Sequence, residues 1–245
     1  ERDAVSEIEN VQENTIDIQN EHHINAIDAD GNCEGTSLLK DIITYGDMIT
    51  NLGGSIEAPL NYNKDFVGLQ KFLSDTGIQN FNAIEAGTPG SKIKAKECGL
   101  KHLIPARACW LRVAALLLTG DKIRSHLKSK IAITSLYRPA CYNKKVKGTA
   151  KSDHLTARSM DLSFYDKEKR KSAADFICQN FWKDDLYNLS PDMNSSQIDD
   201  TLNISIGLGG TYMHIGLSSP QGRRYWIYNS YVKAGGQSNN CWNRP

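Results

Sequence analysis

The stretch ITSLYRPACYNKKVKGTAKSDHLTARSMDLSF, residues 133–164, joins two strand-like runs through a polar loop. The first run, 131–137, is short, apolar and rich in β-branched residues, which is typical of a strand. The second run, 158–164, alternates polar with apolar residues and so predicts a strand with one buried face. Asp161 occupies a polar position, and we expect its carboxylate to point away from the apolar face, where it can meet a side chain of a neighbouring strand.

Two histidines belong with this aspartate in one interpretation. His154 lies in the loop that leads into the second run, and His214 lies inside a later strand-like segment, 212–218. Two imidazoles and one carboxylate around a zinc ion leave a fourth position open for water, which is the arrangement of a catalytic site. The spacing alone fits a surface loop and a packed histidine as well, so the residues by themselves leave both interpretations open.

The second half of the chain predicts an α+β fold. An amphipathic helix at 171–182 is followed by three strand-like segments, ISIGLGG, YMHIGLS and RRYWIYN. Short strands interspersed with helices favour a small, mainly antiparallel sheet with flanking helices.

The first part of the chain predicts a helical N-terminal region. Residues 1–24 carry a thin apolar stripe, and two further helical patterns follow, the second ending near Gly77. The sequence AGTPGSK at 86–92 is typical of a linker. We therefore expect a helical region over residues 1–95 and a second domain over residues 96–245.

Charge and hydropathy exclude two classes of partner. The 245 residues carry a formal net charge of +1, which gives no reason to expect nucleic-acid binding. The longest apolar run, WLRVAALLL at 110–118, is far shorter than the roughly 20 residues of a membrane helix and contains Arg112. We expect no nucleic-acid partner, no membrane span, and a helix here that begins near Pro105 and ends at Gly120.

Six cysteines are scattered along the chain: Cys33, Cys98, Cys109, Cys141, Cys178 and Cys241. None forms a CxxC pair, so a cysteine-based zinc site is not expected. An even, scattered set fits up to three disulfides and an extracytoplasmic location, periplasmic or secreted. The pairing stays open, although a bridge between Cys141 and Cys241 would tie the tail to the body.

The candidate metal ligands are part of a longer ordered motif. Its positions are Ser135, Tyr137, Arg138, Asn143, Gly148, Ser152, His154, Asp161 and His214. This order and spacing resemble the D-Ala-D-Ala metallopeptidase family, which includes zinc D,D-carboxypeptidases, L-Ala-D-Glu endopeptidases, murein endopeptidases and, as a relative, the hedgehog signalling domain. The resemblance covers about residue 100 to residue 228, and an Arg-x-Trp-like element after the last histidine belongs to it. It implies a hedgehog-like fold for this part and leaves the first 90 or so residues unexplained.

The resemblance implies a role for several side chains. His154, Asp161 and His214 would be ligands of Zn²⁺. Arg138 would present a fixed cation to the substrate, because a guanidinium stays charged and offers a planar fork to a carboxylate or a polarised carbonyl. The alternative for Arg138 is a structural ion pair after a strand.

Three further residues are expected on the substrate side of the metal. Ser152 would hydrogen-bond the substrate, with the capping of local backbone as its alternative. Tyr137 and Tyr212 would contact the substrate. The alternative for both tyrosines is packing in the core or at the rim of the site.

The chain departs from the family pattern at three positions. Ala157 stands where the family usually has Gly, and Ser159 where it has Ala; both changes are small unless position 157 needs a positive φ. Thr211 stands where many members carry a Glu that acts as general base, and residues 205–213 contain no acid. Some murein endopeptidases that resemble this chain in its late segment also lack that Glu.

The general base is therefore left unassigned. Asp153 flanks His154 and is a candidate, and His102, Asp199 and Asp200 are others. Each of them can equally be an ordinary solvated or capping residue.

Together these observations predict a zinc metallopeptidase, a carboxypeptidase or an endopeptidase, that hydrolyses the peptide stems of bacterial peptidoglycan. The alternative is a catalytically inactive, zinc-containing module that binds peptidoglycan or a protein partner. The N-terminal region could bind a protein partner of its own.

Overall fold

The computed structural model describes residues 32–33, 36–183 and 204–236; the helix predicted at 1–24 lies outside them. The helices are α3 (Leu38–Asn51), α4 (Phe66–Asp75), α5 (Ala83–Gly87), α6 (Lys92–Lys96), α7 (Trp110–Leu127), α8 (Ala140–Lys145), α9 (Lys167–Ile177) and α11 (Asn229–Lys233). Shorter turns are η1 (Pro59–Asn61), η2 (Arg107–Cys109), η3 (Asp153–Thr156) and the π-helical η4 (Cys178–Lys183).

A five-stranded sheet forms the second half of the fold, as the sequence predicts. Its strands are β3 (Ala132–Ser135), β4 (Ser159–Ser163), β5 (Ser205–Leu208), β6 (Tyr212–Gly216) and β7 (Arg224–Ile227). The order is β3-β4-β6-β5-β7, and every neighbouring pair is antiparallel except β5 and β7. A second, two-stranded sheet pairs β1 (Asn32–Cys33) with β2 (Thr36–Ser37). The α+β class with a mainly antiparallel sheet and flanking helices is confirmed.

One face of the large sheet is buried. The alternating side chains of β4 and β6, among them Met160, Leu162, Met213 and Ile215, are almost fully buried. Helix α9 packs against β6 and also against α7. Because alternate residues of a strand face opposite ways, the neighbours of these apolar side chains are left on the other face of the sheet, where Asp161 lies.

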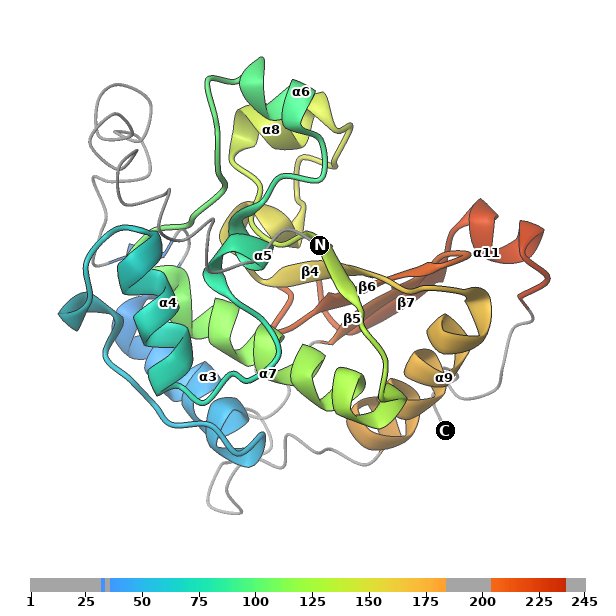
Figure 1. The fold of residues 1–245 in the computed structure, drawn as a ribbon, viewed down its shortest axis with the longest axis horizontal. Coiled ribbons are helices and arrows are strands. Elements are labelled where there is room, and N and C mark those ends of the chain that lie inside the picture. Colours follow the sequence, from blue (N-terminus) through green and yellow to red (C-terminus); the bar gives the residue numbers. More distant parts are fainter. Residues whose placement is uncertain (1–31, 34–35, 184–203, 237–245) are drawn as a thin grey trace.

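Helix α7 runs through the middle of the molecule, with α3 and α4 on one side and the sheet on the other (Figure 1). The prediction that this helix ends at Gly120 is wrong: α7 continues to Leu127. A Cβ at Gly120 would approach the Phe81 ring to 2.8 Å and the Met160 side chain to 3.4 Å. The glycine is there because a ring and the sheet pack closely on the helix, and the buried interior outweighs its helix-breaking tendency.

The helical N-terminal region shares its core with the rest of the chain. The Asp65 carboxylate caps α4 by accepting a hydrogen bond from the Gly68 amide at 2.7 Å, and Gly77 ends the turn after it with a φ of +94°. One hydrophobic core extends from Cys33 in β1 to Tyr231 in α11. The division at residues 95 and 96 stays a prediction.

Two disulfides have both cysteines among the described residues. Cys33 pairs with Cys109, and Cys98 pairs with Cys141, so a bridge between Cys141 and Cys241 is excluded. The second bridge ties the loop after α6 to α8, and these two helices lie together at one edge of the molecule (Figure 1). Spacing could not reveal either pair, because the partners are 76 and 43 residues apart. In the described part of the chain, no helix is both long and apolar enough to cross a membrane.

Candidate metal centre

A single row of residues crosses the open face of the sheet. Asp161 on β4 stands opposite His214 on β6, and the same register places Ser135 on β3 beside Asp161. On the far side of His214, the row continues through Gly207 on β5 to Trp226 on β7. Directly opposed residues of antiparallel strands have Cβ atoms about 5 Å apart, so the register itself brings the carboxylate to the imidazole.

The Asp161 carboxylate lies between two imidazoles. Its Oδ1 is 2.8 Å from Nδ1 of His214, and its Oδ2 is 3.3 Å from Nε2 of His154. The two rings meet edge to face with their centroids 5.1 Å apart. One ligand atom of each of the three residues lies within 4.8 Å of the others, so the predicted ligands are brought together.

His154 reaches the sheet from the loop, and hydrogen bonds fix its ring. Its Nδ1 lies 2.6 Å from the carbonyl oxygen of Leu136, and this bond requires Nδ1 to carry the proton. Nε2 is thereby left with its lone pair towards the carboxylate. The His154 carbonyl in turn accepts a hydrogen bond from the Arg138 amide at 3.0 Å, which ties the loop to the end of β3.

The donor set fits a zinc ion. His154 and His214 are almost fully buried, and the Nε2 atom of each is buried with no hydrogen-bond partner among the described residues. Buried polar atoms without partners are uncommon unless a metal, a water or a substrate completes them. Two nitrogens and one carboxylate oxygen are ligands that zinc takes in three-ligand catalytic sites.

The charges of the cluster suit a cation. Burial lowers the pKa of His154, which favours the neutral imidazole that a metal requires. Burial alone would raise the pKa of Asp161, but the two imidazoles outweigh it and hold the pKa well below its usual range. At neutral pH the centre therefore presents a neutral His154 and an ionised carboxylate.

Arg138 is placed against the same carboxylate. Its Nε donates to the Ser135 hydroxyl at 2.6 Å, and its Nη2 forms an ion pair with Oδ2 of Asp161. The Arg138 side chain is 16% exposed, so it lies at the edge of the centre.

An aromatic wall stands beside His214 on the side away from Asp161. The Trp226 ring is 5.0 Å from the His214 ring, and the Tyr228 ring is 6.0 Å from that of Trp226. Gly207 makes room for it, because a Cβ there would lie 2.5 Å from the Trp226 indole. Sequence reasoning did not assign Trp226 or Tyr228 to the site, although the Arg-x-Trp-like element of the resemblance pointed to the first.

The three predicted substrate residues have different environments. Ser152 is half-buried at the start of η3, and its hydroxyl has no hydrogen-bond partner among the described residues. The Tyr212 ring lies tilted against that of Tyr228 with the centroids 5.1 Å apart, and its hydroxyl accepts a hydrogen bond from Ser230, so it extends the aromatic wall. Tyr137 is half-buried and packs on the core.

Asp153 is buried and takes part in a network of hydrogen bonds. It is 3% exposed, and its Oδ2 accepts from Arg224 at 2.7 Å and from Ser205 at 3.4 Å. The Arg224 guanidinium lies over the Trp226 ring, 5.3 Å from its centroid. Asp153 therefore connects the loop of His154 with the aromatic wall through Oδ2, whereas its Oδ1 is buried with no hydrogen-bond partner among the described residues, and its role as general base stays a prediction.

The other candidates for the general base likewise stay predictions. The His102 ring packs edge to face on Phe66, with centroids 4.7 Å apart. Asp199 and Asp200 lie outside the described residues. Thr211 is exposed, and its carbonyl accepts from the Phe164 amide.

The backbone at position 157 does have a positive φ. Ala157 ends η3 with φ 53° and ψ 30°, in the left-handed region, and its side chain is completely buried. The condition under which the departure from Gly would matter is therefore met, and the left-handed backbone costs on the order of 1–2 kcal/mol at a non-glycine residue.

Part of the chain matches the model of a known protein family. Residues 93–186 match the family model described as Peptidase M15. The matched segment includes His154 and Asp161 and ends before His214, and it spans less than half of the chain. Neither the curated proteins nor the solved structures give a significant match. The match supports a peptidase of the M15 type, in general a zinc metallopeptidase, and is silent on its substrate.

Proposed function

We propose that this protein is a zinc metallopeptidase that hydrolyses peptide bonds in the stem peptides of bacterial peptidoglycan. The observation that carries the proposal is the meeting of His154, Asp161 and His214 within 4.8 Å, inside and next to the segment that matches the M15 peptidases. A chance cluster would not also place Arg138 on the same carboxylate, in the order that the motif requires.

Each residue of the centre has a task that its environment supports. His154, Asp161 and His214 would hold Zn²⁺, which polarises a scissile carbonyl and activates water. The Leu136 carbonyl holds His154 in the tautomer whose Nε2 faces the centre. Arg138, released from Asp161 by the cation, would turn its fork to the substrate carbonyl or to a terminal carboxylate of the stem.

The substrate would lie between the loop that carries Ser152 and the aromatic wall. Ser152 stands at the loop side of the centre with its hydroxyl available for a substrate amide, and the wall of Trp226, Tyr228 and Tyr212 limits the opposite side. The cell-wall substrate is taken from the resemblance of the motif. The disulfides of the chain agree with an extracytoplasmic location, periplasmic or secreted, in which such a substrate is met.

A second candidate function follows from Thr211, which replaces the usual base. A centre that holds zinc without a nearby carboxylate for proton transfer would bind a peptide without cleaving it. In that case the protein is a zinc-containing binding module for peptidoglycan or for a protein partner.

Digestion of purified peptidoglycan decides between the two. We expect zinc-loaded protein to release new muropeptides, and mass spectrometry of the products identifies the bond: free D-Ala marks a carboxypeptidase and shortened or uncrosslinked stems mark an endopeptidase. Asp161→Ala should abolish the products, whereas Lys145→Gln, at an exposed ion pair with Glu97, should leave them unchanged. Muropeptides that stay intact under all conditions, while zinc-loaded protein sediments with peptidoglycan, would establish the binding module instead.

A further inference from the structure

We infer that Asp41 and Arg112 are positioning residues for the zinc site, and that they act through the backbone of the loop that carries His154. The inference rests on the proposed zinc site. It assigns to the N-terminal region, which the M15 match does not reach, a part in metal binding.

Arg112 is a charged residue in the most apolar segment of the chain. It is 0% exposed in the middle of α7, and Asp41 of α3 is 1% exposed. Its Nε and Nη2 donate to the two carboxylate oxygens of Asp41 at 2.6 and 2.9 Å. A buried ion pair contributes little net stability compared with apolar side chains of the same volume, so stability alone is a weak reason for it.

The third donor of Arg112 joins the Asp41–Arg112 ion pair to the loop that carries His154. Nη1 donates to the carbonyl oxygen of Thr156 at 2.9 Å. Thr156 is the last residue of η3, two positions after His154 and directly before the left-handed Ala157. The pair therefore holds the end of the loop just where its backbone turns into β4, the strand that carries Asp161.

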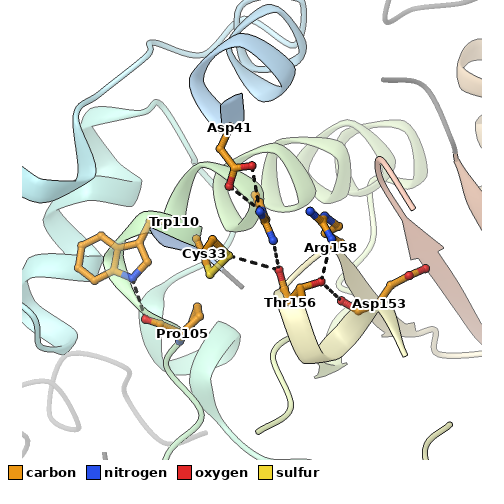
Figure 2. Close-up of a disulfide and its surroundings, with 9 residues drawn as sticks. Cys33, Asp41, Pro105, Trp110, Asp153, Thr156 and Arg158 are labelled. Carbon is orange, nitrogen blue, oxygen red and sulfur yellow. Dashed lines mark hydrogen bonds and ion pairs between the residues drawn. A yellow bond between two sulfur atoms is a disulfide. The ribbon is translucent and has the colours of Figure 1, made fainter. Parts of the chain in front are cut away.

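A disulfide lies beside the same Thr156 carbonyl. Cys33 is bonded to Cys109, three residues before Arg112, and its sulfur lies 3.7 Å from the Thr156 carbonyl. Figure 2 shows Cys33, Asp41 and Thr156 gathered at this point, next to Asp153 and Arg158. β1 and α7 thus meet on one carbonyl group, and α3 is joined to it through the ion pair of Asp41 with Arg112.

Arg112 thus adds one more fixed point to a loop that the Arg138 amide already holds at the His154 carbonyl and that Arg224 holds at Asp153. Leu136 orients the His154 ring, and Arg112 fixes the backbone that carries it. Groups that orient metal ligands without touching the metal change metal affinity by about 10- to 100-fold when they are removed. We expect an effect of this size from the loss of the Arg112 contact.

The test uses the full chain with the pair replaced by apolar residues. Removal of one partner would leave an unpaired buried charge and endanger folding, so the variant is the double substitution Asp41→Leu with Arg112→Met. We expect a folded protein whose zinc dissociation constant, measured by competition with a chromophoric chelator, is at least about tenfold higher than that of the wild type. Arg112→Lys, which keeps the charge and one donor, should recover part of the affinity.

The matched control lies on the same helix. Asp121 is also buried on α7 and accepts from the Gln79 and Asn80 amides at 2.7 and 3.1 Å, far along the helix from Thr156. Asp121→Asn should lower the melting temperature without changing the zinc dissociation constant. A double variant with the affinity of the wild type, or an Asp121 variant with the same loss, would overturn the inference.

Hydrogen exchange tests the positioning of the loop independently of zinc binding. In metal-free protein, we expect faster amide exchange across residues 153–158 in the double variant, but not in Asp121→Asn. If the wild type binds no zinc, the proposed function fails, and the exchange rates still decide whether the pair fixes the loop. Unchanged exchange in this segment would refute the positioning role.

Discussion

Asp161 and His214 are register partners on β4 and β6, and a hydrogen bond of 2.8 Å joins their side chains. Both side chains point to the sheet face opposite to the buried one. A polar contact at this position needs no special loop, because the pairing of two strands is enough to create it. His154 is the member of the centre that comes from a loop, η3, and not from the sheet.

The first prediction concerns metal binding. His154→Ala and His214→Ala should each lose stoichiometric zinc, because two remaining ligands bind the ion too weakly to survive dialysis. His126→Ala should keep it, since that histidine is exposed on α7 and lies outside the cluster. Metal analysis of dialysed protein measures the content. Full zinc in both ligand variants would place the metal elsewhere.

The second prediction separates Arg138 from the ligands. Arg138→Gln should lower kcat/KM on peptidoglycan fragments by roughly 10²–10³, the usual cost of removing a group that stabilises developing charge. Zinc affinity should stay the same or increase, because the guanidinium competes with the cation for the Asp161 carboxylate. Activity assays and chelator competition on the same preparation test both parts. A parallel loss of zinc and activity would show that Arg138 only holds Asp161 in place.

The third prediction concerns the aromatic wall. Gly207→Ala puts a methyl group 2.5 Å from the Trp226 indole, so we expect a loss of about 1–3 kcal/mol in the free energy of unfolding. In Gly207→Ala with Trp226→Ala the clash is gone, and the effects should be less than additive. Urea unfolding of the four proteins in the cycle gives the coupling. Strictly additive losses would mean that Gly207 is not needed to make room for the Trp226 ring.

Much of this centre follows from alternation and spacing. The pattern of β4 places Asp161 on the open face without any knowledge of the partner strand. The residues around it depend on pairings that no local pattern contains. Trp226 reaches His214 because β7 runs parallel to β5 at a particular register, and Gly207 is an unremarkable glycine until that register is known.

The same reason explains the errors elsewhere in the fold. Gly120 is a helix terminator by local rules, but the Phe81 ring packs on it and the helix continues. Arg112 appears in the sequence only as an interruption of an apolar run, and its partner Asp41 is 71 residues away. The disulfide partner of Cys141 was likewise decided by the packing of α6 on α8. Contacts between distant segments are fixed by the whole core, and single-segment patterns do not contain them.

The fourth prediction tests the strain at position 157. Ala157→Gly should change the free energy of unfolding by less than about 1 kcal/mol, because relief of the left-handed backbone is offset by the loss of a buried methyl group. Ala157→Val should cost more than about 2 kcal/mol, because a β-branched residue is strongly disfavoured at this φ and overfills the core. Lys147 has a φ of 61° and an exposed side chain, so Lys147→Gly should stabilise the protein. Equal effects of Gly and Val at position 157 would contradict the strained geometry.

The last prediction concerns the acid stability of the metal-free protein. Burial lowers the pKa of His154, so the unfolded chain takes up a proton at a pH at which the folded protein does not. This difference does not affect the free energy of unfolding above the pKa of His154 in the unfolded chain, about 6.5. It lowers that free energy increasingly as the pH falls from there towards the pKa of His154 in the folded protein. Asp161, whose pKa is depressed, contributes stability that is lost only further down, below about pH 4. Urea unfolding with a chelator present should therefore show a decline that begins near pH 6.5 and is flatter in His154→Gln. Identical slopes for the wild type and His154→Gln would mean that this imidazole is not held neutral in the folded protein.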